Sequence, residues 1–324
     1  MAELRYVRAI AAALGDALAE DEKVIVFGED VSAAGGAFGA SRGLRDRFGA
    51  ERVRDTPLSE AAIVGAAVGA ALGGLRPVVE IMFMDFTTMV MDALVNQAAK
   101  ARFMFGGQSS VPMVLRTPHG GGLSAGPQHS QCLEAWFAHI PGLKVVCPAD
   151  PISAYGLLRA AIRDPDPVIF IENKALYAMK AEQPDELPIL PIGKAATVKA
   201  GNDVSIVTYG ATVHAAVKAA SVLQSEGVDA EVIDLRSLQP WDEAAVLASL
   251  AKTHRLVIAH EAVEAFGIGA EIAARMADAG FDELDGPIVR VGAPFMPVPF
   301  SKELEKAYLP DADAICRAAR RTLE

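Results

Sequence analysis

The sequence predicts an α/β protein of two domains, each built on a mostly parallel sheet flanked by helices. Three observations lead to this fold class. Short apolar runs typical of buried strands alternate with helical patterns along the chain. At 324 residues the chain is long enough for two domains of ordinary size. Residues 184–191 contain three prolines in eight positions, so the alternation is interrupted there by a segment that cannot form a regular element.

The first domain is expected over residues 1–180. An amphipathic pattern predicts a helix over Glu3–Glu20, and the apolar run Lys23–Gly28 predicts the strand that follows. Further strands are predicted at residues 53–56, 77–83, 111–117, 143–147 and 168–172, with helices between them. Strands that alternate with helices indicate a mostly parallel sheet covered on both faces.

Residues 181–191 are interpreted as a proline-rich linker, and residues 192–324 as the second domain. The alternation resumes after the linker. Strands are predicted at residues 204–209, 230–235, 256–260 and 288–291, with helices between and after them. This pattern indicates a second, smaller α/β unit.

The composition of the chain argues against some classes of partner and some cellular compartments. The chain has 41 acidic and 30 basic residues, a net charge of −11, which argues against a nucleic-acid partner because phosphate binding needs a basic face. The longest apolar run, residues 61–75, is shorter than the roughly 20 residues that a membrane span needs. The N-terminus lacks the basic-then-apolar order of a signal peptide. Three widely spaced cysteines, Cys132, Cys147 and Cys316, favour reduced thiols in a cytoplasm over a disulfide framework.

Glu60 is the only acidic residue between Ser59 and Val79, and it begins a helical run with glycines at positions 65, 69 and 73. The run is small and apolar on every side, so the helix is expected to lie inside the protein. A carboxylate at the start of a buried helix is costly without a partner, which suggests a role in proton transfer. An acid that satisfies the amides of the first helical turn is an equally weighted alternative.

Residues 119–126 contain two hydrolase-like patterns. Gly122–Gly126 matches the nucleophile elbow around Ser124, and His119–Gly122 resembles an esterase oxyanion motif. The two motifs share Gly122, whereas an elbow and its oxyanion loop come from different strands. Ser124 also lies seven residues beyond the strand predicted to end at Thr117. A serine hydrolase is therefore disfavoured.

The same glycine-rich loop leads to His129, which stands before a helical pattern through Trp136 and Phe137. Histidine exchanges protons near neutral pH, and α/β proteins place ligands on loops at the carboxyl ends of strands. His129 is therefore a candidate catalytic residue. A structural hydrogen bond at a helix start is the alternative.

Four motifs, in order and spacing, resemble one family: Gly28–Val31, Arg54–Glu60, Phe83–Phe86 and Pro127–Gln131. That family is the beta subunit of the thiamine-diphosphate-dependent 2-oxo acid dehydrogenase, the decarboxylating component of the pyruvate, branched-chain and acetoin complexes. The resemblance extends over nearly the whole chain, through segments 96–100, 135–146, 162–167 and 232–236. It implies a pyrimidine-binding domain followed by a domain similar to the C-terminal domain of transketolase.

The resemblance implies roles for individual residues. Glu60 matches the glutamate that hydrogen-bonds the aminopyrimidine ring of thiamine diphosphate and shares a proton with it. Phe86 matches the aromatic position beside that ring, and Leu58 is expected among the cofactor-binding residues. Glu29 matches a position near the proton path that links paired active sites. His129 matches the histidine that assists decarboxylation or acyl transfer.

The family also holds a structural monovalent cation, expected to be K⁺, on backbone carbonyls and an aspartate. The matching positions here are Met113, Ala161, Ile162, Asp164 and Asp166. Asp166 stands where relatives often carry asparagine. An ordinary Asp-Pro-Asp-Pro turn between a helix and a strand explains the same residues without a cation.

Thiamine diphosphate needs a second half-site, in which a Gly-Asp-Gly motif helps hold Mg²⁺ on the diphosphate, and this chain has no such motif. We therefore expect an alpha subunit to hold Mg²⁺ and the diphosphate in an α₂β₂ heterotetramer. The expected reaction is oxidative decarboxylation of a 2-oxo acid with acyl transfer to a lipoyl acyltransferase core. Pyruvate is the first choice of substrate, followed by acetoin or branched-chain 2-oxo acids. A non-catalytic assembly subunit of such a complex is the alternative.

Overall fold

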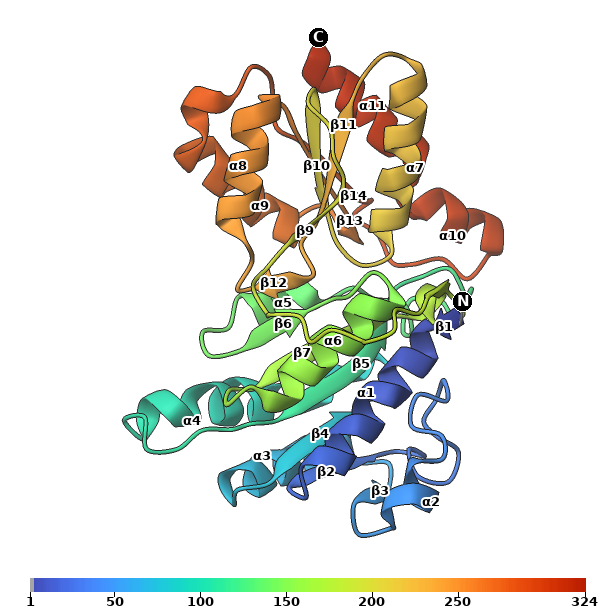
Figure 1. The fold of residues 1–324 in the computed structure, drawn as a ribbon, viewed down its shortest axis with the longest axis vertical. Helices are drawn as coiled ribbons and strands as arrows, with labels where there is room; N and C mark the ends of the chain where they lie inside the picture. The colour runs from blue at the N-terminus through green and yellow to red at the C-terminus, as the bar shows by residue number, and fades with distance from the viewer. Residues whose placement is uncertain (1–2) are drawn as a thin grey trace. The chain divides into compact units, whose positions relative to one another are not determined.

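The structure, a computed structural model, describes residues 3–324 and divides them into two compact units. The first unit runs to His119 and continues over Trp136–Ile192, and the second comprises Gly120–Ala135 and Gly193–Glu324. The glycine-rich segment Gly120–Ala135 thus groups with the second unit. Each unit has a mostly parallel sheet flanked by helices, so the predicted fold class is confirmed (Figure 1).

The sheet of the first unit has the strand order β6-β7-β5-β4-β2-β3, and all of these neighbours pair in parallel. Its strands are β2 (Val24–Gly28), β3 (Val53–Asp55), β4 (Arg76–Glu80), β5 (Val114–His119), β6 (Lys144–Val146) and β7 (Val168–Asn173). Its helices include α1 (Tyr6–Glu20), α2 (Leu44–Phe48), α3 (Glu60–Leu72), α4 (Ala99–Met104) and α6 (Pro151–Arg163). Short helical segments lie at η1 (Met84–Val90), η2 (Ala93–Ala98) and η3 (Lys174–Leu176), and α5 (Glu134–Ala138) follows the glycine-rich segment.

Helices α1 and α6 pack side by side against this sheet (Figure 1). The buried side of α1 carries Tyr6, Ile10 and Leu14, whose spacing of four residues places them on one face. Helix α6 begins with a capping box in which Asp150 accepts from the Ser153 backbone while the Ser153 hydroxyl accepts from the Asp150 backbone. The predicted helix from residue 3 is shorter, because residues 3–5 form the strand β1 (Glu3–Arg5), which pairs antiparallel with β8 (Lys180–Glu182).

Helix α3 differs from its prediction. Only one side of it is buried, through Ile63, Val64, Ala67, Val68 and Ala71. The opposite side, which includes Gly65 and Gly69, is exposed in this chain. The prediction that this helix lies inside the protein was therefore wrong for the chain by itself, because its small outward-facing residues have no cover from the described residues.

The second unit has a sheet in the order β14-β13-β10-β11-β9, in which only β9 runs antiparallel to its neighbour. Its strands are β9 (Ala196–Lys199), β10 (Val204–Thr208), β11 (Ala230–Asp234), β13 (Leu256–Val263) and β14 (Val289–Ala293), and a further short strand, β12 (Ser237–Gln239), follows β11 in the chain. Its helices are α7 (Thr212–Ser225), α8 (Glu243–Thr253), α9 (Ile268–Ala279), α10 (Lys302–Tyr308) and α11 (Ala312–Leu323), with the short η4 (Phe281–Glu283).

Helices cover both faces of this second sheet. Figure 1 shows α7 and α11 on one face and α8 and α9 on the other. The α7 and α11 side forms an apolar core that includes Ile206, Leu223, Val232 and Ile315, all fully buried. Within residues 3–324, no helix combines the length and apolar character that crossing a membrane requires.

Candidate functional site

Three of the predicted site residues lie at the carboxyl edge of the first sheet, where parallel α/β sheets bind ligands. Glu29 directly follows β2, Glu60 is the first residue of α3 after β3, and Phe86 lies in η1 after β4. These strands are neighbours in the order β4-β2-β3. The fold therefore brings residues far apart in the sequence to one edge of the sheet.

Glu29 and Glu60 form an interacting pair of carboxylates. The Glu29 side chain is only 4% exposed, and its Oε1 has no hydrogen-bond partner among the described residues. Burial, followed by the negative charge of Glu60, raises the pKa of Glu29, while the backbone N–H of Ser59 donates to it and opposes this shift. Glu60 itself is half-buried. The pair thus combines a buried carboxyl whose pKa is raised with a carboxyl that reaches solvent.

Phe86 belongs to a cluster of aromatic side chains. Its ring meets Phe83 edge to face, with the ring centroids 5.7 Å apart. Phe83 in turn meets Phe38 at 5.9 Å, and Phe38 stacks on Tyr177 at 4.8 Å. Leu58 is 82% exposed, on the loop that leads into α3. An aromatic surface and an exposed leucine therefore lie at the same sheet edge as the two carboxylates.

A buried ion triad that the sequence reasoning missed underlies this edge. Arg116 on β5 donates through Nε and Nη2 to the two carboxylate oxygens of Glu172 on β7, at 2.7 and 2.9 Å. Its Nη1 donates to Glu80 on β4, directly opposite in the strand register, at 2.8 Å. All three side chains are at most 4% exposed. The available signal was a single charged residue in each of three apolar strand patterns, those of residues 77–83, 111–117 and 168–172.

His129 lies in the second unit and is half-buried. Its backbone N–H donates to the carbonyl of Gly126 at 3.3 Å. Helix α5 begins only at Glu134, so His129 stands in the loop and not at the helix start that the sequence suggested. Gly126 has a φ of +76°, and a Cβ there would overlap the ring of Phe300, so this loop requires glycine where it turns.

The hydrolase-like residues do not form a nucleophile site. Ser124 has a φ of +55° within a loop, and neither a strand nor a helix adjoins it. Its backbone N–H donates to Glu305 at 2.9 Å, and its hydroxyl lies 3.5 Å from the same carboxylate. Glu305 therefore fixes the turn around Ser124, and among the described residues no base of the triad type contacts this hydroxyl.

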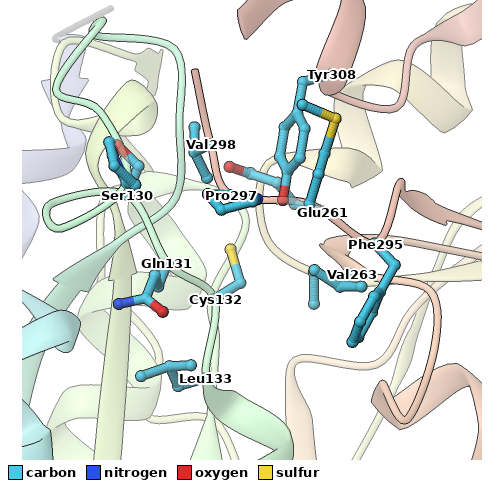
Figure 2. A pocket seen from close by; sticks show the side chains of 13 residues that line it. Ser130, Gln131, Cys132, Leu133, Glu261, Val263, Phe295, Pro297, Val298 and Tyr308 are labelled. Carbon is cyan, nitrogen blue, oxygen red and sulfur yellow. The ribbon is translucent and has the colours of Figure 1, made fainter. Parts of the chain in front are cut away.

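The second unit also encloses a cavity of about 330 Å³ (Figure 2). Cys132, Glu261 and Tyr308 point into it from three segments of the unit, and Val263, Phe295 and Pro297 supply apolar wall. Burial, followed by the neighbouring Cys132 and Glu261, raises the pKa of Tyr308 to about 12. Its hydroxyl therefore stays protonated at neutral pH. None of the predicted site residues lines this cavity.

The five positions expected to bind a monovalent cation gather where α6 ends and β7 begins. Arg76 donates to the carbonyl of Ile162 at 3.0 Å, and Lys144 lies 2.7 Å from the carboxylate of Asp164. Asp166 pairs with Arg102 at 2.5 Å. The carbonyls of Met113 and Ala161 accept from the backbone N–H groups of Val168 and Asp164. Basic side chains of this chain thus already balance the negative charge of this corner.

Both halves of the chain match domain families of known proteins. Residues 2–180 match the family model "Transketolase, pyrimidine binding domain", and residues 193–315 match "Transketolase, C-terminal domain". The chain is 46% identical to the mitochondrial pyruvate dehydrogenase E1 component subunit beta-2 of Oryza sativa, covering 98% of this chain and 86% of the relative.

Two bacterial proteins are similarly close. The beta subunit of acetoin:2,6-dichlorophenolindophenol oxidoreductase of Bacillus subtilis is 48% identical, with 95% of this chain and 93% of the relative covered. The pyruvate dehydrogenase E1 component subunit beta of the same organism is 43% identical over the full length of both. Among solved structures, a split-gene transketolase described as an inactive beta4 tetramer matches with a TM-score of 0.80 over 99% of this chain and 98% of that chain. At 22% identity it supports the fold.

Proposed function

The chain belongs to the family of E1 beta subunits of pyruvate and acetoin dehydrogenases, and from this premise we propose how its own residues serve that activity. The proposed reaction is the decarboxylation of a 2-oxo acid, pyruvate first, with transfer of the acyl group to a lipoyl carrier. Acetoin and branched-chain 2-oxo acids are the next substrates to test. Thiamine diphosphate, when bound, supplies the carbanion chemistry, and the protein supplies orientation and proton control.

The carboxylate pair at the sheet edge is the observation that carries this proposal. Glu60 is open on one side, so its carboxyl can reach a ring nitrogen and exchange a proton with it. Behind it, Glu29 is buried, has an oxygen without a partner among the described residues, and has a pKa raised by burial and by the charge of Glu60, so it releases its proton less readily than an exposed carboxyl. Phe86 supplies an apolar surface for a flat heterocycle, and Leu58 would contact it from the loop before α3. The residues present therefore fit the pyrimidine half of the cofactor.

An alpha subunit is proposed to complete the site in an α₂β₂ assembly. The chain lacks a Gly-Asp-Gly motif, so Mg²⁺ and the diphosphate would be held mainly by the partner. The exposed side of α3 supports such a partner, because Gly65 and Gly69 offer a smooth apolar surface that begins next to Glu60. A lipoyl acyltransferase core is the proposed recipient of the acyl group. A structural K⁺ at the α6 corner is a separate proposal, and such an ion would have to share the Ile162 carbonyl with Arg76 and the Asp164 carboxylate with Lys144.

His129 is proposed to act in decarboxylation or in acyl transfer, as a proton donor or by stabilising negative charge. His129 is half-buried on a loop in which its backbone N–H donates to the carbonyl of Gly126. A cytoplasmic location is proposed because Cys132, Cys147 and Cys316 are thiols without a disulfide among the described residues. The relatives do not favour the alternative of a non-catalytic assembly subunit, since they are named as oxidoreductase or dehydrogenase components.

Reconstitution with the alpha subunit tests the proposal. Decarboxylation is measured with pyruvate, acetoin and a branched-chain 2-oxo acid, each with thiamine diphosphate and Mg²⁺. Glu60→Gln should lower turnover by about 10² or more, because the amide cannot exchange a proton. Glu51→Gln, which changes an exposed acid with a 96% exposed side chain, serves as the control. Full turnover in Glu60→Gln would support an assembly role and overturn the catalytic assignment.

A further inference from the structure

The buried triad of Glu80, Arg116 and Glu172 is unusual in its charge. It places two carboxylates around one guanidinium on three neighbouring strands. Burying ions is costly, and apolar residues of similar volume often give equal or greater stability. Stability alone therefore does not account for this arrangement. Arg116 is held by two parallel hydrogen bonds to Glu172, and its planar guanidinium sets the direction of each contact. The triad therefore fixes the positions of the Glu80 and Glu172 carboxylates relative to each other.

One arm of the triad holds the loop that carries Glu29. Glu80 accepts a hydrogen bond from the backbone N–H of Ala37 at 3.3 Å. Next to it, Gly36 has a φ of +80°, and a Cβ there would lie 2.6 Å from the Glu80 carboxylate. The loop backbone thus packs directly on this carboxylate. A shift of the Glu80 side chain would move the loop that begins at Glu29.

The other arm leads to the aromatic cluster. The Tyr177 hydroxyl donates to Glu172 at 2.7 Å, and the Tyr177 ring stacks on Phe38, one residue beyond Ala37. Phe38 then contacts Phe83, which contacts Phe86. The buried Lys174, on η3 directly after β7, places its Nζ 5.6 Å from the centre of the Phe83 ring. Continuous contacts therefore join the triad to Phe86.

We infer that the Glu80–Arg116–Glu172 triad positions the pyrimidine side of the cofactor site, by holding the 29–43 loop through Ala37 and the Phe86 ring through Tyr177 and Phe38. This inference rests on the proposed function, because it assigns Phe86 to the cofactor. The triad residues are positioning residues, since none of them is proposed to touch the cofactor. Glu172 joins the two arms, because its carboxylate accepts two hydrogen bonds from Arg116 and one from the Tyr177 hydroxyl.

Two variants test the two arms separately. Arg116→Lys keeps the positive charge but removes the two-pronged contact with Glu172. Phe38→Leu leaves the triad intact and removes the stack on Tyr177. Arg159→Lys is the matched control, because Arg159 is 3% exposed and binds Glu20 at 2.5 Å and the Tyr155 hydroxyl at 2.9 Å between α1 and α6. All three are prepared as complexes with the alpha subunit, and their thermal stability is measured alongside.

Cofactor affinity and amide hydrogen exchange are measured in each complex. The dissociation constant for thiamine diphosphate with Mg²⁺ should rise at least about tenfold in Arg116→Lys and Phe38→Leu and stay near the wild-type value in Arg159→Lys. Amide hydrogen exchange in residues 29–43 should accelerate in the same two variants, also at least about tenfold. Loss of stability without these changes is the result expected of the control.

The outcomes distinguish failure of the proposed function from failure of the positioning role. A wild-type complex that binds no thiamine diphosphate would refute the proposed function, whereas loop exchange would still report whether the triad holds residues 29–43. A wild-type complex that binds the cofactor, together with a Phe38→Leu complex that binds it equally well, would overturn the positioning role alone. If Arg116→Lys does not fold, Phe38→Leu decides the question. Equal cofactor affinity in Arg116→Lys and Arg159→Lys would also overturn the inference.

Discussion

Alanine at the exposed glycines of α3 should have opposite effects on the single chain and on the assembled complex. Gly65 and Gly69 lie inside the helix, and a Cβ at either position would meet nothing within 4 Å in this chain. Replacing glycine by alanine inside a helix stabilises it by about 0.8–1.0 kcal/mol. We therefore expect Gly65→Ala and Gly69→Ala each to raise the unfolding free energy of the purified beta chain by about 1 kcal/mol, and its Tm by about 2–4 °C.

In the complex the same methyl groups would enter the surface on which the alpha subunit is proposed to pack. The distance between packed helices depends on the side chains at the contact, so added volume should push the subunits apart. The dissociation constant for the alpha subunit should rise at least about tenfold. Urea unfolding of the beta chain and sedimentation of the mixed subunits measure the two effects.

Ser221→Ala is the matched control for this experiment. Ser221 is exposed on α7 in the second unit, and its hydroxyl donates to the carbonyl of Val217, one turn earlier. The variant should raise helix stability slightly and leave assembly unchanged. A lower stability of the single chain in Gly65→Ala or Gly69→Ala would show that this face is packed within the chain. Wild-type assembly of both glycine variants would show that the alpha subunit binds elsewhere.

Three further predictions concern the second unit. His129→Ala should bind thiamine diphosphate normally but lower lipoyl acylation by about 10² or more, and retention of over half the wild-type rate would contradict its catalytic role. Burial lowers the pKa of His260 below the value of about 6.5 that the unfolded chain is expected to show. The unfolding free energy should therefore be unaffected by this group above pH about 6.5 and should fall as the pH drops below that value. Urea unfolding from pH about 8 to about 5 should show a smaller loss of unfolding free energy in His260→Gln than in the wild type. Gly126→Ala should destabilise the chain by about 2 kcal/mol or more, because its positive φ and the Phe300 ring both oppose a Cβ. Partial recovery with Phe300→Ala would attribute part of that cost to the ring, and wild-type stability of Gly126→Ala would contradict the strained turn.

The strands of both sheets could be predicted where they are buried on both faces. Parallel strands covered by helices appear as short continuous apolar runs, and every strand predicted from such a run is present in the structure. The strands that were missed, β1, β8, β9 and β12, are three or four residues long, and most of their side chains are not buried. Such short strands carry little periodic signal, because their pairing is decided by the tertiary fold.

Only the candidate site residues that belong to sequence motifs could be predicted. Glu29, Glu60 and Phe86 were found through spacing and resemblance, and the strand order explains why they share one edge. The contacts that hold them were not accessible in this way. Arg116 is a single charge within an apolar strand pattern, and its two carboxylates lie 36 and 56 residues away. Pairing between such distant residues follows from the strand register, which a single sequence does not specify.

The error over α3 has a physical origin that bears on assembly. A pattern of small apolar residues on every side indicates that the helix is shielded from water, but it does not indicate which chain covers the helix. In this chain Ile63, Val64 and Val68 are covered, while the side with Gly65 and Gly69 is open. Leu58 and Leu72, at either end of the helix, are also exposed. Apolar residues exposed together in this way are typical of a surface that a partner covers. The sequence prediction and the structure are reconciled if the helix is inside the assembly rather than inside the subunit, and Glu60 then stands where the covered surface begins.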